Sequence, residues 1–195
     1  IKLDGNYPTG TNNVALGNRA LDSVEAGGST NIAIGQDALT ALTTGDFNTA
    51  VGGDALKTNV TGVQNTAVGY QSLTTSTASN NTAVGAYSMR DNTTGGGNVA
   101  FGISALKENT TGDDNTAIGN SSLCNNTTGA NNVAIGKEAL VNNTTGVNNA
   151  VLGRCTLFSN TEGDKNVSIG MSSLRCNLTG CSNTAVGYTA LLKNT

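Results

Sequence analysis

Few side chains in this sequence could take part in catalysis, and their spacing does not assemble a catalytic or metal-binding group. The 195-residue chain has no histidine, which excludes Ser-His-Asp and Cys-His triads and histidine-based metal sites. Its thirteen acidic residues are scattered, and only Asp113 and Asp114 are adjacent. Acid–base catalysis by carboxylates needs a facing pair, one of them with a raised pKa. We therefore expect no enzymatic activity, no cofactor and no metal ion.

The four cysteines suggest one crosslink. Cys176 and Cys181 bracket the loop sequence Asn-Leu-Thr-Gly, which could bring their Cα atoms within the ~4.4–6.8 Å usual for a disulfide. A disulfide between these two residues is therefore predicted. Cys124 and Cys155 stand at different positions of repeats two apart, too distant to pair within one chain, so they are expected to be free or paired between chains.

Asparagine-linked glycosylation is a second possible modification. Asn-x-Ser/Thr sequons form a near-column at one repeat position: Asn59, Asn92, Asn109, Asn126, Asn143 and Asn177. In a secreted eukaryotic protein these residues could carry glycans. The alternative is that turns rich in Asn and Thr generate sequons by chance.

An internal repeat positions all of these residues. An asparagine precedes an apolar triplet eleven times, with spacings of 18, 17, 17 and 16 residues and then 17 residues six times, at Asn13, Asn31, Asn48, Asn65, Asn81, Asn98, Asn115, Asn132, Asn149, Asn166 and Asn183. Such periodicity is typical of solenoid proteins. We divide the chain into a lead-in or cap at 1–12 and an eleven-coil solenoid at 13–195, whose last coil is truncated.

The period and the composition predict an all-β fold. Helical repeats of the ankyrin or tetratricopeptide type need about 33–34 residues, and Gly, Asn and Thr are poor helix formers. The segment "NTAVG" alternates its side chains as a strand does, and "NTTG" marks a turn. The sequence therefore predicts a parallel β-solenoid, or β-roll, with two short strands and two corners in each coil of about seventeen residues.

The repeat columns suggest which residues form the core. The fourth position is mostly Val, Ile or Leu and the ninth is Leu in ten of eleven coils, so these two columns are expected to fill the interior. The third position, mostly Ala, would then face away from the interior. Small residues let another sheet or chain approach closely, which predicts interchain packing at Ala67, Ala83, Ala100, Ala117 and Ala134. The alternative is an exposed strand face that merely tolerates Ala.

Two further columns are invariant, and two coils are irregular. Glycine at the fifth position is expected where φ is positive or another backbone comes close. The repeated asparagine is expected at a left-handed corner or in a ladder of stacked amides. A one-residue slip inside a strand would reverse its faces, so the long first coil should bulge near 24–29 and the short fourth coil should tighten near 77–80.

Charge and hydropathy exclude two classes of partner. The formal net charge is −3 and no basic run exists, which argues against nucleic-acid binding. No apolar stretch approaches the ~18 residues of a membrane span.

The segments "NNVAIG" (Asn131 to Gly136) and "TNIAIG" (Thr30 to Gly35) resemble the head repeats of YadA-like trimeric autotransporter adhesins. The wider block "NTAVGYQSL" is similar to repeats of phage tail-fibre proteins. The resemblance implies a left-handed β-roll in which three chains pack together, with Val133-Ala134-Ile135 and its equivalents as inner strands. The adhesin repeat is about fourteen residues long, whereas this one is seventeen.

The function expected from these features is structural. The chain is expected to form a non-catalytic segment of an extracellular, cell-surface or virion-surface fibre that mediates attachment, as a homotrimer with a receptor, glycan or matrix protein as partner. The alternative is a monomeric ice-binding solenoid, suggested by the threonine pairs at 93–94, 110–111, 127–128 and 144–145.

Overall fold

Each repeat contributes one three-residue strand, which begins directly after the repeated asparagine. The computed structural model describes residues 10–24 and 28–194, and no helix occurs within them. The strands are β1 (Val14–Leu16), β2 (Ile32–Ile34), β3 (Thr49–Val51), β4 (Thr66–Val68), β5 (Thr82–Val84), β6 (Val99–Phe101), β7 (Thr116–Ile118), β8 (Val133–Ile135), β9 (Ala150–Leu152), β10 (Val167–Ile169) and β11 (Thr184–Val186).

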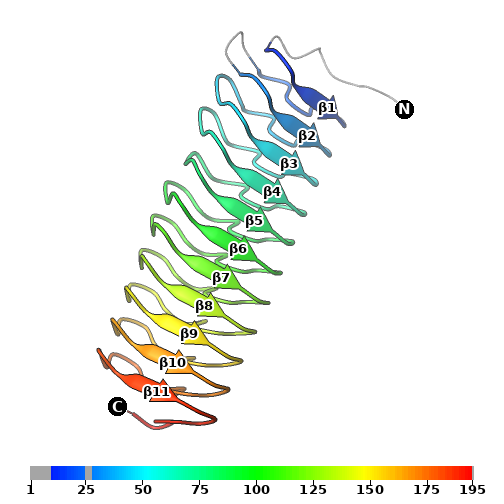
Figure 1. Cartoon of the computed structure of the whole chain (residues 1–195). Coiled ribbons are helices and arrows are strands. Elements are labelled where there is room, and N and C mark those ends of the chain that lie inside the picture. The colour runs from blue at the N-terminus through cyan, green and yellow to red at the C-terminus, as the bar shows by residue number, and fades with distance from the viewer. Residues whose placement is uncertain (1–9, 25–27, 195) are drawn as a thin grey trace.

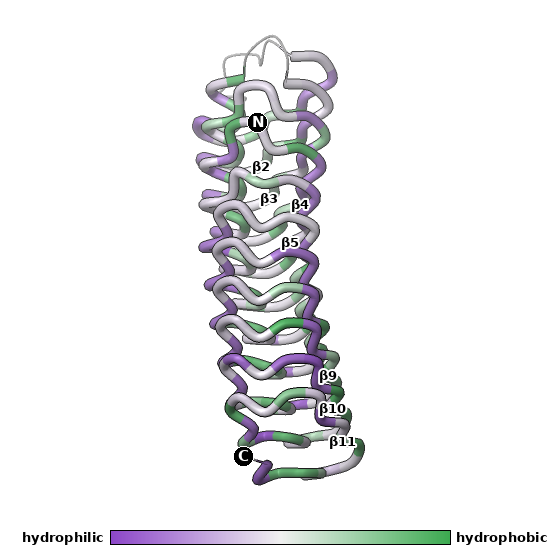
Figure 2. The backbone as a smooth tube through the Cα atoms, turned by 90° about the vertical axis from the view of Figure 1, so that its left-hand side faces the viewer, coloured by the Kyte–Doolittle hydropathy of each residue, from purple (hydrophilic) through white to green (hydrophobic). Residues whose placement is uncertain are grey.

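The strands stack in chain order into one parallel sheet, which confirms the predicted β-solenoid. Every strand pairs with its predecessor and its successor, and the sheet runs along the length of an elongated rod (Figure 1). The repeat columns are therefore also spatial columns. Hydrophilic residues recur at the same places in successive turns and form columns along the rod (Figure 2).

The two irregular spacings do not disturb the strand register. Val14 pairs with Ile32 across the long first coil, and Thr66 pairs with Thr82 across the short fourth coil. In the short coil the missing residue lies between Ser76 and Ser79, and the carbonyl of Ala78 takes the place that a glycine carbonyl has elsewhere. The prediction that length changes fall in corners is confirmed for this coil, whereas the bulge predicted near 24–29 includes residues outside the described part of the chain.

The sheet faces are the reverse of the sequence prediction. Ala67, Ala83, Ala100, Ala117 and Ala134 are fully buried within their own chain, so their predicted role in interchain packing is wrong. The side chains at the second and fourth positions point outward instead. The interior is narrow, and the leucine column of the opposite wall fills most of it, so that the inward face of the strands carries alanine in most coils and Val151 in β9.

The wall opposite the sheet contains turns rather than the second strand that the sequence suggested. In each coil the seventh and ninth residues have positive φ; Ser121 has 53° and Leu123 has 52°. A left-handed conformation costs a non-glycine residue about 1–2 kcal/mol. Hydrogen bonds between coils hold this conformation, as when Leu123 N donates to Ala139 O at 2.9 Å. The predicted burial of the leucine column is confirmed for Leu21 through Leu174.

Candidate functional surfaces

Two buried ladders of asparagine side chains run along the interior and account for the most regular polar residues. In the first ladder, Asn48 Nδ2 donates to Asn31 Oδ1 at 3.1 Å and to Gly62 O at 2.8 Å, and Asn48 N also donates to Asn31 Oδ1. The bond from the backbone N–H to the preceding Oδ1 recurs in every coil as far as Asn183, and the side-chain bonds recur in most of them. These amides are satisfied within the fold, which confirms the ladder interpretation of the repeated asparagine.

The second ladder contains the sequon asparagines. Asn59, Asn92, Asn109, Asn126, Asn143 and Asn177 are fully buried. Asn109 Nδ2, for example, donates to Asn92 Oδ1 at 2.7 Å and to Gly112 O at 2.9 Å. A glycan is attached to this same nitrogen and would have to lie inside the coil. Glycosylation at these six positions is therefore incompatible with the folded chain, and that prediction is wrong.

The predicted disulfide is absent. Cys176 and Cys181 are both free and exposed. Asn177, directly after Cys176, turns inward and donates to Gly180 O at 3.0 Å, so the corner is closed by an amide rather than by a crosslink. Cys181 Sγ instead accepts a hydrogen bond from Asp164 N of the preceding coil at 3.3 Å.

The other two cysteines are also free and lie inside or near the core. Cys124 is half-buried, and burial raises the pKa of its thiol. Cys155 is buried, with Sγ 3.4 Å from Glu138 Oε2. A thiol with a raised pKa is a poor nucleophile, so Cys124 has no environment that would activate it.

Ionic side chains form ion pairs along one edge of the coils. Asp37, which is almost fully buried, accepts from Arg19 Nε at 2.6 Å and pairs with Lys57 Nζ at 3.5 Å. The hydrogen bond from Arg19 lowers the pKa of Asp37. No group of three or more His, Cys, Asp or Glu side chains suited to a metal ion occurs within the described residues.

The threonine pairs proposed for ice binding divide into two kinds. The first threonine of each pair donates its hydroxyl to a backbone carbonyl of the next coil, as when Thr110 Oγ1 bonds Thr127 O at 2.9 Å. The second threonine is exposed in each case: Thr94, Thr111, Thr128 and Thr145. The surface therefore presents one exposed threonine in three of these coils, and two in the coil of Thr93 and Thr94.

The outward face of the sheet is the largest apolar surface that the coils build. Of the eighteen exposed large hydrophobic residues in the described part of the chain, ten lie on this face: Val14, Leu16, Ile32, Phe101, Ile118, Val133, Leu152, Val167, Ile169 and Val186. We call this surface the outer strand face. Sequence reasoning missed it because it assigned the fourth column to the interior. Large exposed apolar patches on soluble proteins mark interaction sites.

Comparisons with other proteins return no relatives: no family model matches the chain, and no curated protein or solved structure matches it. Among residues 10–24 and 28–194 there is no helix of the length and hydropathy needed to cross a bilayer.

Proposed function

We propose that this chain is a non-catalytic structural segment of an extracellular, cell-surface or virion-surface fibre that mediates attachment, and that its copies pack together through the outer strand face. The observation that carries the proposal is this apolar face, whose exposed large side chains lie on β1, β2 and β6 to β11 and are not covered within the chain, while β3 to β5 present threonine and half-buried valine there. Repetition supports the fibre role, because each coil covers the open edge of its neighbour and adds length without new packing.

Packing between copies would bury apolar surface in addition to the small interior core of the single chain. The interior of each coil holds mainly one strand alanine and one leucine, with a small residue or alanine beside the leucine. Burial of apolar surface contributes about 25 cal/mol per Å², so covering Phe101, Ile118 and their neighbours would add substantially to this thin core. A homotrimer is the assembly implied by the resemblance to adhesin head repeats.

The oligomeric mass tests the proposal. Light scattering at several concentrations should give a mass near 58.5 kDa, three times the 19.5 kDa of one chain. The double variant Ile118→Lys with Ile135→Lys places charges on the outer strand face of two adjacent strands, and it should be monomeric with an unchanged β-sheet circular dichroism spectrum. Asn120→Lys, an exposed change off that face, is the matched control. A monomeric wild-type chain at all concentrations would refute packing between copies.

Ice binding by a monomer is the competing function, and the exposed column of Thr94, Thr111, Thr128 and Thr145 favours it. A regular row of threonines on a rigid solenoid presents methyl and hydroxyl groups at a constant spacing. Thermal hysteresis that is lost in Thr128→Lys and kept in Ile118→Lys would select this function. The fibre proposal predicts no hysteresis in either the wild type or the variants.

A further inference from the structure

Two tyrosines of neighbouring coils form an exposed pair outside the outer strand face. The rings of Tyr70 and Tyr87 lie 5.6 Å apart with an interplanar angle of 85°. Edge-to-face contact is a favourable arrangement of two aromatic rings, so each ring helps to hold the other in place. The chain has only three Phe, four Tyr and no Trp, and half of the Tyr70 side chain is accessible to solvent.

The preceding coil leaves room beside the Tyr70 ring. Gly53 occupies the repeat position of Tyr70, and a Cβ atom there would lie 3.4 Å from Tyr70 Cδ2. The φ angle of Gly53 is not in the left-handed region, unlike that of the neighbouring Gly52, so its backbone conformation does not call for glycine. Because Gly53 has no side chain, its backbone is left uncovered next to the Tyr70 ring; we call this uncovered backbone the Gly53 shelf.

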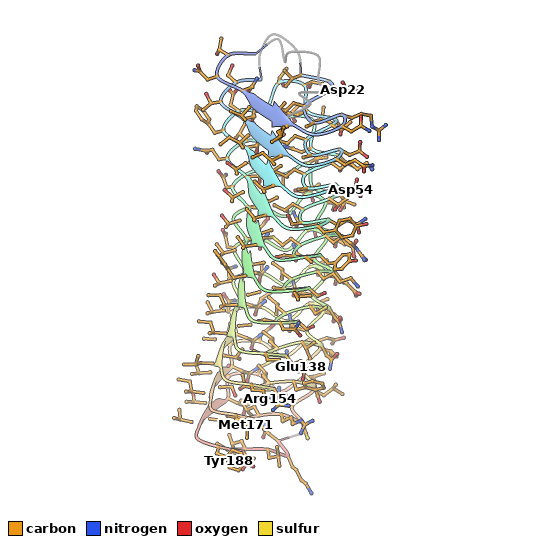
Figure 3. All side chains as sticks on the ribbon, turned by 90° about the vertical axis from the view of Figure 1, so that its right-hand side faces the viewer. Asp22, Asp54, Glu138, Arg154, Met171 and Tyr188 are labelled. Atoms are coloured by element: carbon orange, nitrogen blue, oxygen red, sulfur yellow. The ribbon has the colours of Figure 1, made fainter. Side chains whose placement is uncertain are left out.

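A row of hydrogen-bonded polar side chains continues from the tyrosines toward the N-terminus. Gln71 Nε2 donates to Tyr70 Oη at 3.2 Å and to Asp54 Oδ2 at 3.3 Å. Lys57 Nζ donates to Asp54 Oδ1 at 2.9 Å and to Asp37 Oδ2 at 3.5 Å, and so links the two carboxylates. Figure 3 shows the side chains on this side of the solenoid, with Asp54 labelled. The polar groups are held in fixed positions before any ligand arrives.

The charges in this row cancel. Arg19 and Lys57 are positive, Asp37 and Asp54 are negative, and each is paired with a neighbour. The row therefore has no unpaired charge with which to attract an ion. From the coil of Arg19 to that of Tyr87 it covers four strand spacings, or about 19 Å at ~4.8 Å each, which is longer than a single sugar ring.

We propose that the part of this row formed by Gly53, Asp54, Lys57, Tyr70, Gln71 and Tyr87, which we call the strip, binds a neutral oligosaccharide. A sugar has an apolar face of C–H groups and a rim of hydroxyls. The first matches the accessible ring of Tyr70 beside Gly53. The hydroxyls can donate to the amide oxygen of Gln71 and the carboxylate of Asp54, since both N–H groups of Gln71 are already donated to Tyr70 and Asp54. The inference rests on the attachment function proposed above and names the class of molecule to which the fibre would attach.

An array of neutral, sulfated and sialylated oligosaccharides tests the proposal, followed by calorimetry with the best neutral ligand. The wild-type chain should bind neutral chains, and Tyr70→Ala should bind about tenfold more weakly, a loss of roughly 1.4 kcal/mol. Tyr188→Ala is the matched control because Tyr188 has the same repeat position, is 71% exposed and lies at the other end of the solenoid. Its affinity should equal that of the wild type.

Gly53→Val gives an independent check, because a side chain there fills the shelf without removing an aromatic ring. It should weaken neutral saccharide binding while the melting temperature and the oligomeric mass stay unchanged. The proposal is overturned if no neutral saccharide binds, if only charged saccharides bind, or if Tyr70→Ala and Tyr188→Ala bind equally. Because the oligomeric mass is measured separately, failure here is distinguishable from failure of fibre packing.

Discussion

Asn126 Nδ2 lies 2.7 Å from Asn109 Oδ1 of the preceding coil and donates a hydrogen bond to it. The same nitrogen donates to Gly129 O at 2.9 Å, which closes the corner of its own coil. Asn143 Nδ2 in turn donates to an oxygen of Asn126, at 2.8 Å. One side chain thus joins three successive coils while it remains fully buried. Asparagine suits this position because its amide has both a donor and an acceptor.

Replacing Asn126 with alanine should therefore destabilise the solenoid strongly. The change leaves Asn109 Oδ1 without its donor and removes one of the two acceptors of Asn143 Nδ2, which keeps Gly146 O. A buried unsatisfied group costs about 1–3 kcal/mol. We expect the free energy of unfolding, measured by urea titration, to fall by at least ~2 kcal/mol. Asn120→Ala, at an exposed position of the same coil, should change it by less than about 0.5 kcal/mol. Equal stabilities of the two variants would contradict the ladder as a source of stability.

The solenoid period, its parallel pairing and the corner location of the length change in the fourth coil could all be predicted from the sequence, because they follow from repeat spacing alone. Which face of the sheet points into the interior could not be predicted. Alternation shows that Ala117 and Ile118 point to opposite sides, but it does not show which side is interior. The greater hydrophobicity of Ile118 suggested the wrong answer, since the leucine column already fills the narrow interior and the inward strand position is alanine in most coils, with Val151 the largest residue there.

The corner residues were harder to predict because their roles depend on geometry between coils. The sequon at Asn109 has the same sequence whether the asparagine amide is exposed to solvent or bonded to a neighbouring amide, so its burial could not be predicted. Leu123 gives no sign in the sequence that its φ is positive, since leucine rarely adopts that conformation. Tyr70 and Tyr87 occupy different repeat positions, the sixth and the seventh, so comparing columns does not bring them together.

The glycine after each strand should tolerate no side chain. Gly119 has φ of 130°, and a Cβ atom there would lie 2.6 Å from the carbonyl oxygen of Gly136. Because both the conformation and the contact with backbone oppose a side chain, Gly119→Ala should lower the free energy of unfolding by on the order of 3 kcal/mol or more.

Gly53→Ala is the matched control for the glycine prediction. At Gly53 the nearest atom to an added Cβ is in the Tyr70 ring at 3.4 Å, and φ is outside the left-handed region. The same substitution here should leave stability within about 1 kcal/mol or raise it slightly, through a less flexible unfolded chain. If Gly119→Ala and Gly53→Ala melted at the same temperature, close approach of the coils at the glycine column would not limit stability.

Ser72 is the residue at which a substitution should stabilise the fold. It is fully buried at the eighth position, and its hydroxyl has no hydrogen-bond partner. Other coils place alanine at this position, as at Ala55 and Ala105. Ser72→Ala should raise the free energy of unfolding by about 1 kcal/mol by removing a buried unsatisfied group.

A serine with a partner gives the control for this prediction. Ser122 stands at the same repeat position and donates to Ala134 O at 2.7 Å. Ser122→Ala should therefore lower the free energy of unfolding by about 1 kcal/mol. Differential scanning calorimetry of both variants would show melting temperatures displaced in opposite directions. Shifts of the same sign would mean that the hydrogen bond does not decide the outcome.

The N-terminal coils should lose stability in acid through Asp37. The pKa of this carboxyl is lowered in the folded chain, chiefly by the hydrogen bond from Arg19. A carboxyl with a depressed folded pKa stabilises the fold above its unfolded pKa, which is about 3.9 for Asp. This contribution disappears as pH falls through the lower folded value. Asp37→Asn should thus be less stable than the wild type at pH 6, and the gap should close toward pH 2.

Urea titrations at pH 6, 4 and 2 would measure this gap. Asparagine preserves the shape of the side chain and tolerates the positive φ of 56° at position 37, so the variant removes mainly the charge. Because the Arg19 side chain is 54% exposed, added salt should weaken the effect at pH 6. Glu162→Gln, which removes a carboxylate from an exposed corner, is the control and should leave the free energy of unfolding at pH 6 nearly unchanged. A gap between Asp37→Asn and the wild type that stayed constant from pH 6 to pH 2 would show that the charge of Asp37 contributes nothing to folding.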